Sequence, residues 1–157
     1  MKTKIGILCL LVATVLINIF VFANSFDDVQ ESYEKSDVVT NAVESIVNEQ
    51  NGINWNLSKL IRKSAHLFEF ALLGITVTFC LYLIKRCYSK RFYGFGCFYV
   101  LAIAVIDEFI QSFSDRTSSV GDVLLDFCGF IIGAVVVLIC VAVFRVIAKR
   151  KENKCIN

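Results

Sequence analysis

Side chains that could carry chemistry gather in two stretches, each at the edge of a long apolar run. The first is R-K-S-A-H-L-F-E-F, residues 62–70, which contains the only histidine of the chain, His66. Ionisable groups in or beside membrane spans cost free energy, so they tend to be paired and functional. The second stretch runs from residue 107 to residue 133 and holds five carboxylates: Asp107, Glu108, Asp115, Asp122 and Asp126. We therefore take both stretches as the candidate site.

His66 favours acid–base chemistry. Arg62, His66 and Glu69 recur at i, i+4 and i+7, so they share one face of a helix. An imidazole oriented by a carboxylate can act as a general base or acid near neutral pH. We take His66, Asp122 and Glu108 as hypothetical catalytic residues. Polar packing or ligand binding by His66 explains the same pattern and stays open beside catalysis.

Other chemistries lack their usual residues. A metal site is disfavoured because the chain offers one nitrogen ligand, and none of its seven cysteines lies in a segment expected on the outer side. No G-x-S-x-G, Cys/His pair or P-loop occurs, which disfavours serine, thiol and nucleotide chemistry. We expect no metal and no cofactor, and no nucleic acid among the partners.

Basic residues near the same stretches suggest anion binding. Arg62, Lys63 and Arg116 are expected at the outer rim, where they could hold a phosphate or carboxylate, and the guanidinium of an arginine has the forked geometry that suits either group. The plainer interpretation is that they balance the acids and anchor helix ends by snorkelling. Asp107 and Gln111 are four apart and share a helix face. The candidate ligand-binding residues are Arg62, Lys63, Glu69, Asp107, Gln111, Arg116 and Asp126.

A stripe of small and acidic residues predicts close helix packing. Asp122, Asp126, Gly129 and Gly133 fall on one face of a helix. The G-x-x-x-G formed by Gly129 and Gly133 lets another helix backbone approach closely. Chance matches to this motif are common in apolar helices, but the two acids that continue the stripe favour a real contact.

Four apolar runs must position these residues. The chain is 57% hydrophobic and 19% charged, without proline, and its mean hydropathy is +0.68. The runs cover residues 5–23, 57–84, 92–111 and about 120–144, which predicts an all-α integral membrane bundle of four transmembrane helices. We divide the chain into a first transmembrane helix (1–24), an acidic extracellular segment (25–56), a membrane domain (57–144) and a basic cytoplasmic tail (145–157).

The N-terminal half leaves alternatives open. The first run is just long enough to span, but Val21-Phe22-Ala23 could also end a cleaved signal peptide. In the acidic segment, Val39, Val43, Ile46 and Val47 repeat at helical spacing and predict an amphipathic helix in the first extracellular loop. That helix would lie on the bundle or the lipid surface, or cover a substrate as a lid.

Charge segregation predicts the topology and the depth of the site. Positive charge stays on the cytoplasmic side, so both termini are expected inside a multi-pass cell-membrane protein. Glu69 and Asp107 then lie about 22 Å, and Asp126 about 27 Å, from the inner edge of a roughly 30 Å core. We expect one polar site in the outer third of the membrane. Eleven of the sixteen bases lie at the N-terminus, in the 85–91 turn and in the tail: Lys2, Lys4, Lys85, Arg86, Lys90, Arg91, Arg145, Lys149, Arg150, Lys151 and Lys154.

The two stretches resemble the VanZ-like family, and the resemblance covers about residues 57–140. Their sequences are R-K-S-A-H-L-F-E-F and D-E-F-I-Q-S-F-S-D-R-T-S-S-V-G-D-V-L-L-D-F-C-G-F-I-I-G. That family is named for an accessory protein of bacterial glycopeptide resistance clusters, linked to reduced teicoplanin susceptibility. The resemblance implies a cell-envelope role, with membrane lipids and a lipid-linked cell-wall precursor or glycopeptide as partners, and leaves the oligomeric state undefined. The alternative is a membrane enzyme that acts on a lipid-linked phosphate or amide. The family's characteristic positions fall on Lys63, His66, Glu108, Gln111, Arg116, Asp122, Gly129 and Gly133.

Overall fold

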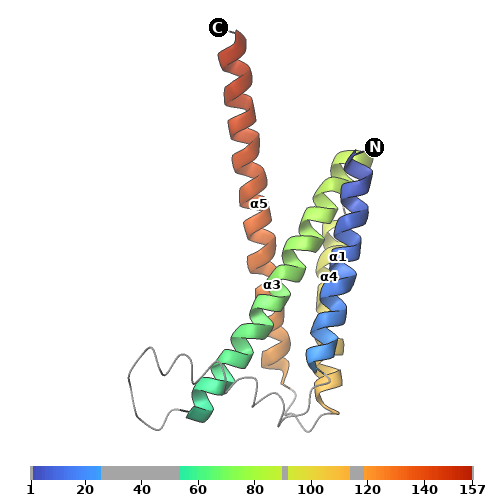
Figure 1. Ribbon diagram of the computed structural model, residues 1–157, viewed down its shortest axis with the longest axis vertical. Coiled ribbons are helices and arrows are strands. Elements are labelled where there is room, and N and C mark those ends of the chain that lie inside the picture. The colour runs from blue at the N-terminus through green and yellow to red at the C-terminus, as the bar shows by residue number, and fades with distance from the viewer. Residues whose placement is uncertain (1, 26–53, 90–91, 114–118, 157) are drawn as a thin grey trace.

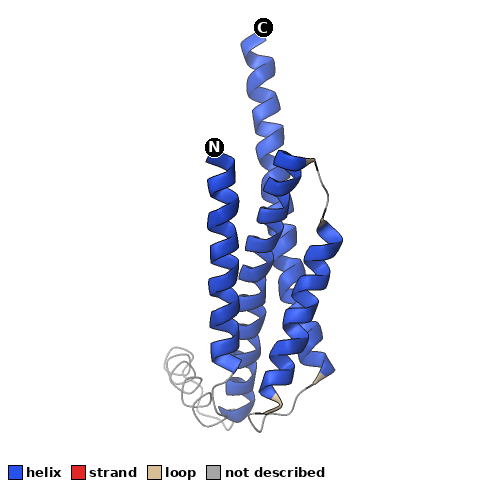
Figure 2. Ribbon diagram, turned by 90° about the vertical axis from the view of Figure 1, so that its right-hand side faces the viewer, coloured by secondary structure: helices blue, strands red, loops and turns tan. Residues whose placement is uncertain are grey.

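All regular elements of the described residues are helices. The computed structural model describes residues 2–25, 54–89, 92–113 and 119–156 (Figures 1 and 2). Its helices are α1 (Lys2–Ser25), α3 (Asn54–Tyr88), α4 (Tyr93–Gln111) and α5 (Val120–Ile156), and each is long and apolar enough to cross a membrane. The predicted bundle of four transmembrane helices is therefore confirmed. The amphipathic helix predicted in the first loop lies outside the described residues.

The last helix is longer than the apolar run that predicts it. α5 continues through the basic segment that we expected as a separate tail and ends at Ile156. The segment after Gly133 contains no glycine or proline that would stop a helix. By contrast, α3 ends where Ser89 takes a left-handed conformation with φ of 55° and its N–H bonds to the Lys85 oxygen at 2.9 Å.

α3 is the central helix of the bundle. It packs on α1, α4 and α5, and α4 also contacts both α1 and α5. Among the described residues, α1 and α5 do not touch each other. Figure 1 shows that the start of α1, the end of α3 and the end of α5 point to one end of the bundle. The end of α1, the end of α4 and the start of α5 lie at the opposite end, which we call the loop end. Which end faces the cytoplasm stays a prediction.

The surface of the bundle is apolar and its interior contains polar groups. Phe68, Phe98 and Phe144 are 63%, 69% and 72% exposed, as befits side chains that face lipid. An apolar core is formed by Val21, Phe70, Leu73, Val77, Val100, Ala104 and Phe130. The buried polar residues are Thr14, Asn18, Ser25, Glu69, Thr78, Asp107, Glu108 and Asp126.

Glycines bring α3 and α5 into backbone contact. A Cβ built on Gly129 would overlap the main-chain oxygen of Leu67, and one on Gly133 would overlap that of Ala71. From the other side, a Cβ on Gly74 would overlap the oxygen of Phe130. Both glycines of the G-x-x-x-G therefore face α3, and Gly74 is a reciprocal contact that the sequence pattern did not indicate. This crossing sets α3 against the first half of α5, where the acidic residues lie.

Candidate functional site

Five carboxylates from three helices meet at the loop end. Glu69 comes from α3, Asp107 and Glu108 from α4, and Asp122 and Asp126 from α5. We call this set the carboxylate cluster. Four of its members are at most 9% exposed, and Asp107 has no exposed surface. Burying this many acids is costly unless hydrogen bonds and opposite charges compensate, and the neighbouring side chains supply part of both.

His66 lies between two members of the cluster. Its Nδ1 is 3.9 Å from Glu69 Oε2 and 3.9 Å from Asp107 Oδ2, and its side chain is 15% exposed. These distances are too long for hydrogen bonds, but a protonated imidazole would form ion pairs with both carboxylates. The helix face shared by His66 and Glu69 is thus directed at α4.

Asp107 and Glu69 are held by donors from α1. Ser25 Oγ donates a hydrogen bond to Asp107 Oδ1, and Asn24 Nδ2 donates one to Glu69 Oε1 at 2.7 Å. Gln111 Nε2, one turn along α4, donates to Asp107 Oδ2 at 2.8 Å. Sequence reasoning missed Asn24 and Ser25. Their only signal was two consecutive polar residues at the end of the first apolar run.

The outer part of the cluster joins α3 and α4 to the start of α5. Lys63 forms an ion pair with Asp122, in which the side chains are 39% and 27% exposed. Glu108 Oε1 accepts a hydrogen bond from the Ser119 N–H at 2.6 Å, immediately before α5 begins. The other oxygen of Glu108 and Oε2 of Glu69 are buried without a hydrogen-bond partner in the part of the chain that the structure describes. Burying an acceptor oxygen without a hydrogen bond costs free energy, so each of these two oxygens needs a donor.

A small cavity opens among these groups. Its volume is about 20 Å³, enough for roughly one water-sized group. Arg62 and Lys63 line this cavity together with three of the carboxylates, Glu108, Asp122 and Asp126. Arg116, the remaining predicted ligand-binding residue, lies outside the described residues. The cavity is lined by Arg62, Lys63, His66, Glu108, Gln111, Asp122, Leu125 and Asp126.

A sequence model of the VanZ/LLP1 family matches residues 8–142. The chain belongs to the VanZ/LLP1 family. The match begins inside α1 and ends inside α5, so it takes in all four helices and the whole carboxylate cluster. No curated protein and no solved structure matches the chain.

The arrangement of this VanZ-family site permits two kinds of chemistry. It can bind a polar group, because charged and hydrogen-bonding side chains surround a small cavity. It can also support proton transfer, because a carboxylate beside one ring nitrogen orients an imidazole to exchange protons through the other. Metal binding has less support: no group of three or more His, Cys, Asp or Glu side chains in the described ranges is arranged to hold a metal ion.

Proposed function

We propose that this VanZ-family protein acts at the outer face of the cell membrane by binding the polar part of a lipid-linked or amphiphilic ligand in the carboxylate cluster. Its physiological effect would be modulation of the cell envelope or glycopeptide (teicoplanin) tolerance. The observation that carries the proposal is the convergence of three carboxylates (Glu108, Asp122 and Asp126), His66 and Lys63 around one cavity at the loop end, with Asp107 Oδ2 3.9 Å from the imidazole. Such a concentration of ionisable groups is expensive in a membrane and is retained where it serves a function.

The charges of the site favour a ligand that donates hydrogen bonds. Lys63 is engaged by Asp122, which leaves it less available for a phosphate. Glu108, one of the residues that line the cavity, has an oxygen (Oε2) that lacks a donor within the described ranges. A hydroxyl or amine of the ligand would satisfy such an acceptor, and a phosphate oxygen would not. Lipid-linked sugars and glycopeptides both carry hydroxyl groups.

A membrane enzyme is the second candidate function, and the position of His66 favours it. The imidazole lies 3.9 Å from Asp107 Oδ2, and that carboxylate is itself fixed by Ser25 and Gln111. His66 would then act as acid or base on a lipid-linked phosphate or amide, with Asp107 orienting it.

Substitutions at the site test whether it functions at all. We expect His66→Ala, Asp122→Asn and Arg116→Ala each to abolish glycopeptide tolerance in cells that depend on this protein. Lys149→Ala, far along α5, should leave tolerance intact. Double variants should be no worse than single ones, because groups that act as a unit do not contribute independent terms. Immunoblots of the membrane fraction control for expression, and full tolerance in well-expressed His66→Ala and Asp122→Asn would refute the proposal.

Lipids that copurify with the protein distinguish binding from catalysis. Mass spectrometry before and after incubation with an envelope lipid extract should show an enriched species of unchanged mass if the protein binds. A new product mass would support the enzyme. If the protein is an enzyme, His66→Asn should remove nearly all turnover. If it is a binding protein, the same substitution should lower the affinity for the ligand only in part.

A further inference from the structure

A second cavity lies between α3 and α5 in the half of the bundle away from the carboxylate cluster. The two helices touch at Gly74, Gly129 and Gly133 and separate beyond this crossing towards the end of α5 (Figure 1). The crevice between them has a volume of about 930 Å³, at the upper end of the roughly 300–1,000 Å³ of ligand sites.

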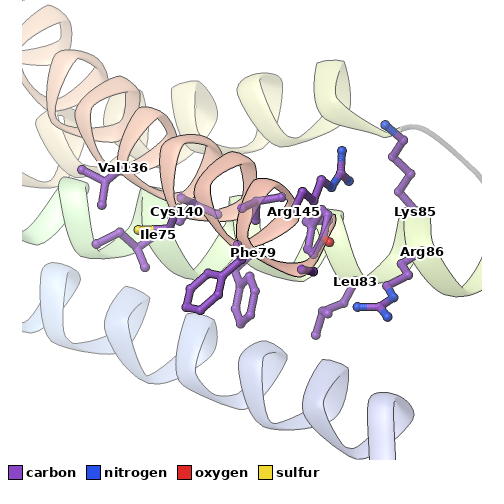
Figure 3. Close-up of a pocket in the computed structure, with 13 residues that line it drawn as sticks. Ile75, Phe79, Leu83, Lys85, Arg86, Val136, Cys140 and Arg145 are labelled. Atoms are coloured by element: carbon purple, nitrogen blue, oxygen red, sulfur yellow. The ribbon is translucent and has the colours of Figure 1, made fainter. Parts of the chain in front are cut away.

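The crevice changes from apolar to basic along its length. Figure 3 shows Ile75 and Val136 near one end, Phe79 and Cys140 in the middle, and Lys85, Arg86 and Arg145 at the other end. Arg145 lies over the ring of Tyr82, with its guanidinium carbon 5.4 Å from the ring centroid. No carboxylate is among the described residues that line it.

The dimensions match one leaflet of a bilayer. From Ile75 to Arg86, α3 rises about 16 Å at 1.5 Å per residue. Half of a roughly 30 Å hydrocarbon core is about 15 Å. An acyl chain that lies along the apolar wall therefore brings its headgroup to the level of the basic residues. Basic pockets between transmembrane helices on the cytoplasmic side suit anionic headgroups.

We propose that this crevice is a binding site for an anionic phospholipid of the inner leaflet. One acyl chain packs between Phe79 and Cys140, and the phosphate lies at the level of Lys85, Arg86 and Arg145, whose charges attract it. The site is separate from the carboxylate cluster, and it stands whether or not the cluster binds a ligand. The glycine crossing creates the crevice, because it holds the helices together at one level and lets them separate at the next.

Native mass spectrometry of the full-length protein tests the headgroup preference. We expect phosphatidylglycerol to be retained at least about tenfold better than phosphatidylcholine, since each nearby base contributes roughly fivefold. Replacing Lys85, Arg86 and Arg145 together by Gln should remove that preference. The matched control replaces Lys149, Arg150 and Lys151 of α5 by Gln, which removes the same charge from the same end of the bundle at residues that do not line the crevice. It should retain the preference.

A variant that fills the crevice tests where the lipid lies. Cys140→Trp should reduce retention of both lipids, whereas the triple Gln variant of Lys85, Arg86 and Arg145, here called the rim variant, should affect only the anionic one. Three results would overturn the proposal: equal retention of the two lipids by the wild-type protein, equal loss in the rim and control variants, or a dimer that Cys140→Trp dissociates. The last would mean that a second copy of the chain fills the crevice. Unchanged thermal melting of each variant in detergent excludes misfolding as the cause.

Discussion

Ser25, the last residue of α1, donates a hydrogen bond to Asp107 of α4, and neither residue has any exposed surface. This contact joins the N-terminal helix to the most deeply buried acid of the carboxylate cluster. Together with the bond from Asn24 to Glu69, it makes the end of α1 part of the candidate site. An apolar N-terminal run that resembles a signal segment therefore supplies two of the site's donors.

We expect Ser25→Ala to lower the free energy of unfolding by about 1–3 kcal/mol, because it leaves a buried carboxylate oxygen without its donor. Denaturant titration in detergent measures the effect. Ser64→Ala is the matched control, since its exposed hydroxyl bonds to Leu60 O of its own helix. That variant should stay within about 0.5 kcal/mol of the wild type. An equally small effect of Ser25→Ala would show that the hydrogen bond between Ser25 and Asp107 does not contribute to the free energy of unfolding.

The purified protein should retain residues 1–23. Val21 has no exposed surface, and Asn18 Nδ2 bonds to the Tyr99 hydroxyl at 2.6 Å, so cleavage before Asn24 would open the core and remove a polar contact with α4. The intact mass of protein isolated from membranes measures this directly. A mature chain that begins at Asn24 would contradict the prediction and restore the signal-peptide interpretation.

Gly133→Leu should destabilise the bundle by about 1–3 kcal/mol or more, because any side chain there overlaps the main-chain oxygen of Ala71. Gly94→Leu makes the same chemical change where a Cβ meets nothing within 4 Å. It should be neutral or slightly stabilising, since glycine is unfavourable within a helix. Thermal melting in detergent compares the two. Equal melting of the two variants would mean that α3 and α5 do not pack through this glycine.

Cysteines introduced at Glu34 and Ser118, in a background without native cysteines, should react with an impermeant thiol reagent added to intact cells. The reason is that the basic ends of the four helices are expected to stay in the cytoplasm. A cysteine at Lys149 is the control and should be protected. Protection of residue 34 or 118 would show that the orientation is wrong.

Lys63→Met should lower the free energy of unfolding by less than about 1 kcal/mol. The side chains of Lys63 and its partner Asp122 are 39% and 27% exposed, and solvent weakens ion pairs between exposed groups. Unfolding by denaturant in detergent checks this. If the variant folds well but loses glycopeptide tolerance, Lys63 acts on the ligand and not on the fold. A loss of several kcal/mol would instead mean that the pair is a structural element.

The sequence by itself determined the four transmembrane helices that the structure describes and the level of the polar groups along them. Local hydrogen bonding sets the rise of a helix, so counting residues from the basic ends places Glu69, Asp107 and Asp126 at similar heights. Periodicity likewise put His66 and Glu69 on one face, and Asp107 and Gln111 on another. These relationships lie within single helices and need no knowledge of how the helices pack.

Only the tertiary structure decided which faces meet and where the helices separate. Helix rotation and crossing depend on contacts between residues distant in sequence, such as Gly74 with Phe130 and Ser25 with Asp107. No local pattern indicated that the end of α1 reaches Asp107. The crevice beyond the glycine crossing was also absent from the sequence, because its shape comes from the angle between two helices and not from the residues of either one.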